Sequence, residues 1–209
     1  RLLPPKNPRR TFFMRPAGLP VPAHRPIVAL SGTMIHDYSH PYLREVLSRT
    51  RSIAMVGISL NQIRPSYFVA RYLANQGFKI LPVNPVYAGQ KAFGSNVYKS
   101  LATIPKKQGP VDMVDIFRRS EDAGRVVDEA LDKLLHRGLK TIWMQIGVID
   151  KAAAKRAEKK GVEVLMDVCP KMEYQRLWGE LSRGGINSGV VTSKLGYVSL
   201  QLPGTAKKS

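Results

Sequence analysis

A glycine turn followed by hydroxyl and guanidinium side chains is the feature of this chain best suited to binding an anion. Gly57 and Ser59 come directly after the apolar run 53–56, and Arg64 and Ser66 follow shortly afterwards. A strand, a glycine turn and a helix start in succession present unpaired backbone N–H groups, which together with the helix macrodipole favour a phosphate. The turn lacks the complete G-x-G-x-x-G of a dinucleotide site. The pattern alone therefore leaves open a nucleotide-binding turn and an ordinary strand-to-helix turn.

Apolar runs alternate with helical segments along the chain, which predicts an α/β fold. The expected strands are 53–56, 78–83, 111–117, 141–146 and 162–166, and the expected helices are 41–49, 67–76, 121–137 and 151–160. Ser66, Ser120 and Asp150 are expected N-caps of the last three helices. The alternation implies right-handed crossovers and a doubly wound, mostly parallel Rossmann-like sheet in a single domain. Residues 84–110 interrupt it, and we expect there a loop with a short helix or turn that shields the ligand site.

Composition favours one globular domain between two basic extensions. We assign residues 1–38 to a proline-rich N-terminal extension, residues 39–178 to the domain and residues 179–209 to a C-terminal extension. The extensions show no helical or strand period of useful length, apart from a possible short strand at 196–202. No apolar run approaches the roughly 18 residues that span a bilayer. The one cysteine, Cys169, rules out a disulfide within this sequence and favours a reducing compartment.

The net charge of +18 on 209 residues is large, and much of it lies near the ends of the chain. Such a surplus favours a polyanionic partner, either RNA or an anionic membrane surface, while a solvated basic surface is the alternative. The candidate RNA-binding residues are Lys6, Arg9, Arg10, Arg15, Arg25, Lys207 and Lys208. Residues 1–26 contain arginine but neither Asp nor Glu, as is typical of mitochondrial import, although their prolines favour an extended mature arm. We expect the mitochondrial matrix, with the cytoplasm as the alternative.

Polar and charged side chains also follow the other expected strands. These residues are Asn84 and Pro85 after the second strand, Arg118 and Arg119 after the third, Gln145 at the fourth, and Cys169 and Lys171 after the fifth. In an open parallel sheet, ligands bind outside the carboxyl ends of the strands, where the strand order reverses. We therefore expect these residues to meet in one crevice, with a charged surface helix start as the alternative interpretation of Arg118.

Several motifs in register carry a resemblance to a known family. They are Val56-Gly57-x-Ser59 with Arg64-Pro65-Ser66-Tyr67, Pro82-Val83-Asn84-Pro85, Ser100-Leu101-x-x-Ile104-Pro105, Val111-Asp112-x-Val114-Asp115-Ile116-Phe117-Arg118-Arg119, Trp143-Met144-Gln145-x-Gly147-Val148 and Met166-Asp167-x-Cys169-Pro170-Lys171-x-Glu173. Over about residues 45–178 the chain resembles the small bacterial-type CoA-binding proteins, which are related to the CoA-binding domain of succinyl-CoA synthetase alpha subunits. Relative to that pattern, residues 106–109 lengthen the loop before the third strand.

The resemblance implies CoA or acyl-CoA as the ligand and a place for each part of it. Gly57, Ser59 and the helix start at Ser66, with the charge of Arg64, would hold a phosphate group. Val83, Asn84 and Pro85 would border the adenosine end. Phe117 and Arg118 would flank the adenine or its phosphates. Gln145, Cys169 and Lys171 would lie near the pantetheine or an acyl group.

No nucleophile, base and orienting group come together in the sequence, which predicts a protein that is not an enzyme. Cys169 beside Lys171 is either a thiolate of low pKa or, as we prefer, a buried thiol. His36, Asp37 and His40 lack a third ligand, so no metal site is expected. The favoured function is a non-catalytic subunit of a large RNA-containing assembly, with a mitochondrial ribosome as the preferred case and ribosomal RNA and proteins as partners. The alternative is a free-standing protein that binds or senses CoA or acyl-CoA.

Overall fold

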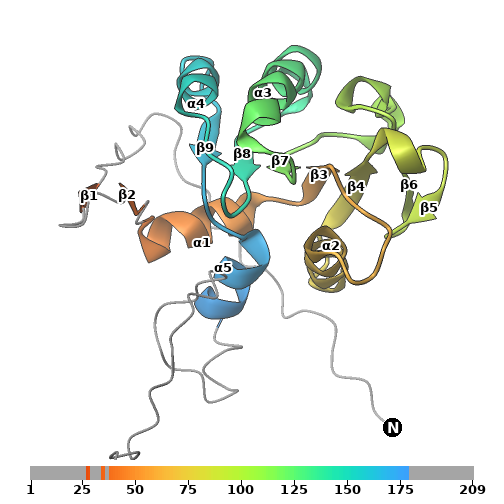
Figure 1. The fold of residues 1–209 in the computed structure, drawn as a ribbon, viewed down its shortest axis with the longest axis horizontal. Coiled ribbons are helices and arrows are strands. Elements are labelled where there is room, and N and C mark those ends of the chain that lie inside the picture. The colour runs from red at the N-terminus through yellow and green to blue at the C-terminus, as the bar shows by residue number, and fades with distance from the viewer. Residues whose placement is uncertain (1–26, 29–33, 36–37, 179–209) are drawn as a thin grey trace, which may run out of the picture.

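The protein is built around a five-stranded parallel sheet (Figure 1). The computed structural model describes residues 27–28, 34–35 and 38–178. The strands lie in the order β4 (Lys79–Val83), β3 (Ser52–Val56), β7 (Met113–Ile116), β8 (Thr141–Met144) and β9 (Glu163–Leu165). Every neighbouring pair in this sheet is parallel, which confirms the doubly wound α/β prediction. The order reverses between β3 and β7, so a ligand crevice is expected outside the carboxyl ends of these two strands.

Helices cover both faces of the sheet (Figure 1). α1 (His40–Arg49), α2 (Pro65–Asn75) and α5 (Pro170–Leu177) lie on one face, and α3 (Ser120–Leu134) and α4 (Lys151–Glu158) lie on the other. A 3-10 turn, η4 (Leu135–Arg137), extends α3. The sequence predicted every one of these helices except α5. No helix in the described part of the chain has both the length and the apolar character needed to cross a membrane.

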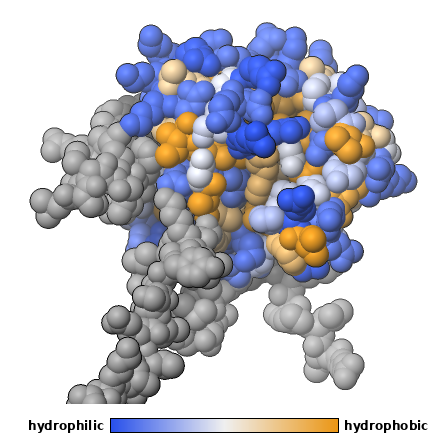
Figure 2. Space-filling model, in the orientation of Figure 1, coloured by the Kyte–Doolittle hydropathy of each residue, from blue (hydrophilic) through white to orange (hydrophobic). Residues whose placement is uncertain are grey.

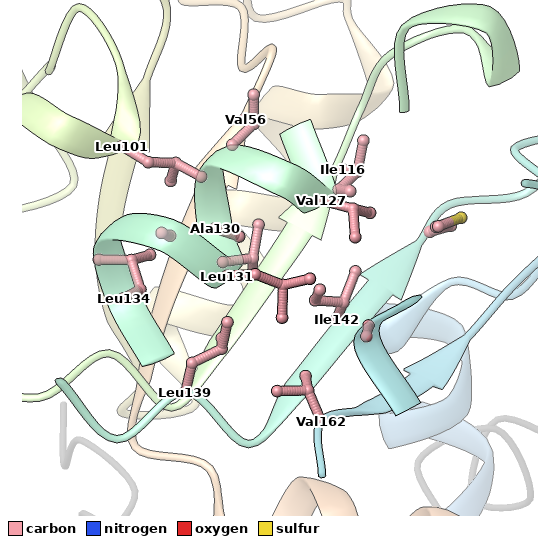
Figure 3. Close-up of a cluster of buried hydrophobic side chains, with 14 of the residues drawn as sticks. Val56, Leu101, Ile116, Val127, Ala130, Leu131, Leu134, Leu139, Ile142 and Val162 are labelled. Carbon is pink, nitrogen blue, oxygen red and sulfur yellow. The ribbon is translucent and has the colours of Figure 1, made fainter. Parts of the chain in front are cut away.

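The sheet separates two hydrophobic clusters, as its uninterrupted apolar strands require. In the first, α3 presents Val127 and Leu131 to the strand residues Ile116 and Ile142 (Figure 3). In the second, α1, α2 and α5 pack on the other face, around the fully buried Trp143. Each large apolar side chain buried in this way contributes roughly 1.5–3 kcal/mol. On the viewed surface, hydrophilic residues gather over α3 and α4, and hydrophobic residues reach the surface between these helices and α2 (Figure 2).

The helix starts differ in part from the prediction. Asp150 is the N-cap of α4, and its side chain accepts a hydrogen bond from the backbone N–H of Ala153 at 2.9 Å. The predicted N-caps Ser66 and Ser120 are wrong, because α2 and α3 begin earlier, with Arg64 and Arg119 as N-caps. The Ser66 side chain does not cap its helix, and its hydroxyl instead accepts a hydrogen bond from the preceding loop.

The segment between β4 and β7 forms several short elements that cover the β4 edge. They are η1 (Pro85–Tyr87), the hairpin β5 (Lys91–Ala92) and β6 (Ser95–Asn96), η2 (Leu101–Thr103) and η3 (Lys106–Gln108). Tyr98 donates its backbone N–H to Pro82 O at 2.8 Å and accepts from Asn84 N at 2.9 Å. The short helical turns were expected, whereas the hairpin was not.

The N-terminal region contains a short antiparallel pair, β1 (Ile27–Val28) and β2 (Met34–Ile35), where no strand was expected. Tyr38, placed in the extension by the sequence, is buried and accepts a hydrogen bond from Met166 N at 2.8 Å. The candidate RNA-binding residues Lys6, Arg9, Arg10, Arg15, Arg25, Lys207 and Lys208, and the possible strand at 196–202, lie outside the described residues.

Candidate nucleotide-binding site

The Gly57 turn is pressed against the end of β7 at the point where the strand order reverses. Gly57 donates its backbone N–H to Val83 O at 2.9 Å, and Phe117 donates its own to Val56 O at 2.8 Å. A Cβ on Gly57, whose φ is +86°, would lie only 2.3 Å from Phe117 O. The close approach of two strand ends therefore requires glycine at this position, whether or not a ligand also needs it.

The loop after β3 is held by the serines that the sequence singled out. Ser59 donates its backbone N–H to Ser66 Oγ at 3.0 Å, and Ser66 is buried. Ser59 Oγ lies 3.4 Å from the Tyr87 hydroxyl, which belongs to η1. The structure thus brings Ser59 and Ser66 together. It also adds Tyr87, which the sequence analysis missed although it lies only three residues beyond Asn84.

Asn84 joins the loops after β3 and β4. Its Nδ2 donates to Ile58 O at 2.7 Å, and its Oδ1 accepts from Val86 N at 3.0 Å. The amide expected to face the sugar or base of a ligand is therefore engaged within the protein on both of its polar atoms. Val83 beside it is buried, whereas Pro85 is exposed at the start of η1.

Two guanidinium groups supply the positive charge of the crevice. Arg118 is half-buried, and its Nε lies 3.2 Å from the position of a Cβ built on Gly57. Arg64 is exposed at the start of α2. Among the residues that the structure describes, no carboxylate forms an ion pair with either group. Because a guanidinium matches phosphate geometry, the unpaired Arg118 over the Gly57 turn can hold an anion. The half-buried Phe117 lies next to it in the chain.

The side-chain amide of Gln145 is hydrogen-bonded to the buried carboxyl group of Asp115. Its Nε2 donates to both oxygens of Asp115, at 2.9 and 3.0 Å. Burial raises the pKa of Asp115 from 3.8 to about 8, although the hydrogen bonds from Gln145 and Ile116 act in the opposite direction. The sequence analysis assigned no role to Asp115. The signal was a single carboxylate inside an otherwise apolar strand.

Cys169 and Lys171 lie at the start of α5, on the same side of the sheet as α2. Burial raises the pKa of Cys169 to about 11, so its thiol is protonated at neutral pH. Lys171 Nζ donates to Gln175 Oε1 at 2.9 Å and lies 5.4 Å from the ring centroid of Tyr72. Six predicted residues therefore lie at the switch point: Gly57, Ser59, Ser66, Asn84, Phe117 and Arg118. Gln145 lies beside them at the end of β8, where its side chain is bonded to Asp115 and its backbone N–H to Ile116 O. Cys169 and Lys171 lie at the start of α5, and Lys171 contacts Gln175 and Tyr72.

The histidine pattern considered for metal binding is only partly described. His36 and Asp37 lie outside the described residues, and His40 Nε2 contacts the Arg176 guanidinium. Within the described ranges, no three His, Cys, Asp or Glu side chains are arranged to hold a metal ion.

The sheet order defines a doubly wound α/β domain, and the unpaired Arg118 guanidinium at the switch point makes its carboxyl edge the candidate ligand site. The backbone N–H groups of Gly57 and Ser59, which the sequence predicted to be open to a phosphate, are hydrogen-bonded to Val83 O and Ser66 Oγ instead. The chain belongs to the family described as the CoA binding domain, whose model matches residues 51–175.

Three similar proteins come from two bacteria and an archaeon. The uncharacterized protein YneT of Bacillus subtilis strain 168 is 34% identical over 132 residues, which cover 63% of this chain and 91% of YneT. A solved structure from Thermus thermophilus is 31% identical, covers 67% of this chain and 99% of its own, and has a TM-score of 0.59. A hypothetical protein from Pyrococcus horikoshii OT3 is 29% identical, covers 76% and 100%, and has a TM-score of 0.61.

Proposed function

We propose that the carboxyl edge of the sheet binds CoA or acyl-CoA and holds it without a chemical step. The observation that carries this proposal is the unpaired Arg118 guanidinium lying over the Gly57 turn at the switch point. Membership of the CoA-binding domain family supports CoA as the nucleotide.

In this proposal, the residues at the carboxyl edge have different roles in binding CoA. The Arg118 guanidinium and the N-terminus of α2, with Arg64 at its start, attract the phosphates. The Gly57 turn lets the backbone come close to them, while Asn84, Ser59 and Ser66 keep the loops in place through the hydrogen bonds described above. Most of the predicted ligand residues thus shape the crevice, and the arginines supply the charge.

A binding role without catalysis agrees with the state of the cysteine. Cys169 is buried, and its raised pKa keeps the thiol protonated, whereas a nucleophilic cysteine needs a thiolate. The carboxyl group of Asp115 is also unsuited to act on a ligand, because it is fully buried and hydrogen-bonded to the side-chain amide of Gln145.

A matched pair of adjacent arginines tests the proposal. CoA should raise the melting temperature of the full chain, and Arg118→Ala should remove most of this shift. Arg119→Ala changes the net charge equally, and its exposed side chain makes no capping hydrogen bond, so this variant should keep the shift. Unchanged melting of the wild-type protein in millimolar CoA, with no nucleotide in native mass spectra, would rule the proposal out.

We also propose that the protein serves as a subunit of an RNA-containing assembly, with a mitochondrial ribosome as the preferred case. The net charge of +18 favours this second function, since basic side chains bind phosphate backbones without reading bases. The proposal places the protein in the mitochondrial matrix with ribosomal RNA and proteins as partners.

Sedimentation of the native protein tests the second function. It should travel with ribosomal particles from mitochondria at about 0.2 M salt, where a few phosphate contacts alone lose affinity steeply. Recovery as a free monomer under these conditions, or exclusion of a tagged chain from mitochondria, would argue against it. Neither result bears on CoA binding.

A further inference from the structure

The amino edge of the sheet, opposite the candidate CoA site, brings together residues from distant parts of the chain. Lys79 donates its backbone N–H to Arg51 O at 2.8 Å, Lys140 donates to Asp112 O at 3.0 Å, and Glu163 donates to Lys140 O at 2.9 Å. These residues stand at or just before the starts of neighbouring strands. They therefore form a fixed row along this edge.

Basic side chains dominate the row and the turns beside it. Those with exposed side chains are Arg51, Lys79, Lys106, Lys107, Lys140, Lys159 and Lys160. Some charges of this edge are paired: Asp112 lies 3.5 Å from Lys140 Nζ and accepts from the backbone N–H groups of Arg51 and Ser52, and Glu163 pairs with Arg49. Asp132, near Lys160, pairs with Lys133. Five exposed lysines of this edge form no ion pair within the described ranges and outnumber the neighbouring exposed Glu158, so the edge keeps a net positive charge: Lys79, Lys106, Lys107, Lys159 and Lys160.

A hollow opens on this same edge, and an arginine without a carboxylate partner forms part of it. The hollow has a volume of about 530 Å³ and is lined by Lys106, Gly109, Pro110, His136, Arg137 and Gly138. Arg137 donates to three carbonyl oxygens, those of Ile104 at 2.8 Å, Pro105 at 3.1 Å and Gly109 at 2.9 Å. Within the described ranges it has no ion pair, so these bonds fix the guanidinium without neutralising it.

We propose that this amino edge is a binding surface for the phosphate backbone of RNA, with a backbone phosphate in the hollow beside Lys106 and Arg137. The proposal rests on the second function proposed above and assigns to the folded domain a contact surface separate from the terminal extensions. Clustered Lys and Arg on one face are the electrostatic footprint of a nucleic-acid partner. The Arg137 guanidinium has no counter-charge and attracts a phosphate by its charge, with its Nε–H and one N–H of Nη1 left to donate.

An RNA backbone fits this edge better than an anionic membrane does. Surface binding to lipid combines basic residues with large apolar side chains that enter the acyl boundary. Of the exposed large apolar residues in the described part of the chain, Leu135 lies next to the hollow and is only 36% exposed, whereas Ile63 and Val86 lie beyond the opposite ends of the strands. The edge therefore offers charge with little apolar surface.

The two edges can be occupied together. β3 has five residues, so at a rise of about 3.3 Å per residue the Cα atoms at its two ends lie about 13 Å apart. A CoA molecule at the carboxyl edge leaves the amino edge open to RNA.

Two double variants of the full chain test the assignment by fluorescence anisotropy. The probe is a labelled oligouridylate of about 20 nucleotides at about 0.15 M salt. Lys106→Gln with Lys107→Gln removes two charges from the amino edge, and Lys91→Gln with Lys99→Gln removes two exposed charges elsewhere. The first pair should weaken binding about tenfold and lower the slope of log K against log salt by about 1.4, because each single-strand phosphate contact contributes about 0.7. The control pair should change the affinity less than about twofold.

The possible outcomes separate the two proposals. Equal losses from both pairs, or no loss from the first pair, would overturn the amino edge as the binding surface while leaving RNA binding by the extensions intact. Failure of the wild-type chain to bind RNA, or its preference for vesicles containing phosphatidylserine, would overturn the surface and the RNA function together. Circular dichroism of each variant shows whether a loss reflects unfolding.

Discussion

The carbonyl oxygen of Phe117 lies 2.3 Å from the position that a Cβ on Gly57 would occupy. This approach joins the ends of β3 and β7, the two strands between which the sheet order reverses. The close contact between these two strand ends therefore lies at the candidate ligand site. Gly57 is consequently expected to matter both for stability and for the proposed CoA binding.

Gly57→Ala should destabilise the protein more than an alanine at a similar backbone conformation elsewhere. The conformation alone costs a non-glycine residue about 1–2 kcal/mol, and the overlap with Phe117 O adds roughly 1–3 kcal/mol. Gly89 is the matched control, because its φ of +88° is nearly the same and a Cβ there meets no atom within 4 Å. Urea unfolding of the two variants measures the difference. Equal losses would show that the approach to Phe117 is not the cause.

Asn84 should be needed for the shape of the loops. Asn84→Asp keeps the acceptor for Val86 N but loses the donor to Ile58 O, and it buries a charge. The free energy of unfolding should fall by about 1–3 kcal/mol, as for other buried polar groups left unsatisfied. The exposed Asn61→Asp, where the side chain accepts from Ile63 N, should cost less. Similar losses from the two variants in urea unfolding would contradict a structural role for the Asn84 amide.

The predictable part of the fold lies in its long, regular elements. The apolar runs that became β3, β4, β7, β8 and β9 were visible because strands of a parallel sheet are buried on both faces. The hairpin β5–β6 was missed because its strands have only two residues each and its turn uses Phe93 and Gly94, at φ +52° and +77°, in place of Asn-Gly. α5 was missed although Pro170 at its first position is a helix-start signal, because Cys169 and Lys171 were interpreted only as a strand end.

The predictable part of the site is its location. Strand-end positions placed Gly57, Asn84 and Arg118 correctly at one edge, since parallel strands share their direction. Which polar atoms are free for a ligand was not predictable. Ser66 Oγ accepts a hydrogen bond from Ser59 N, and Gln145 Nε2 donates to Asp115. Both bonds depend on how separate segments of the chain pack together, which the sequence pattern does not show.

Asp115→Asn should flatten the dependence of stability on pH. The raised pKa means that the folded protein keeps a proton on Asp115 that the unfolded chain releases above about pH 3.8. The resulting stabilisation is complete below pH 3.8, is lost as the pH rises, and is gone above about pH 8. In this window the loss approaches about 1.4 kcal/mol per pH unit.

Urea unfolding of the wild-type protein and the Asp115→Asn variant at about pH 4.5 and about pH 7.5 measures the effect. The free energy of unfolding of the variant, relative to that of the wild-type protein, should be higher at about pH 7.5 than at about pH 4.5. Asp128→Asn, at an exposed position paired with Arg156, serves as the control and should not show this gain. Parallel pH profiles for the wild-type and Asp115→Asn proteins would mean that the buried carboxyl group is ionised throughout.

Cys169 should resist thiol reagents in the folded protein. Its side chain is buried, and the raised pKa leaves almost no thiolate at neutral pH. The reaction with a disulfide reagent such as dithionitrobenzoate should be at least about a hundredfold slower than for the urea-unfolded chain. Comparable rates would indicate an accessible, activated cysteine and would favour a chemical role.

Hydrogen exchange with and without CoA tests the central claim most directly. CoA should slow exchange of backbone amides in residues 57–67 and 117–120 at the carboxyl edge, and leave residues 104–110 and 137–140 at the amino edge unchanged. Protection confined to the amino edge, or no protection in millimolar CoA, would contradict the claim that the switch point holds the nucleotide.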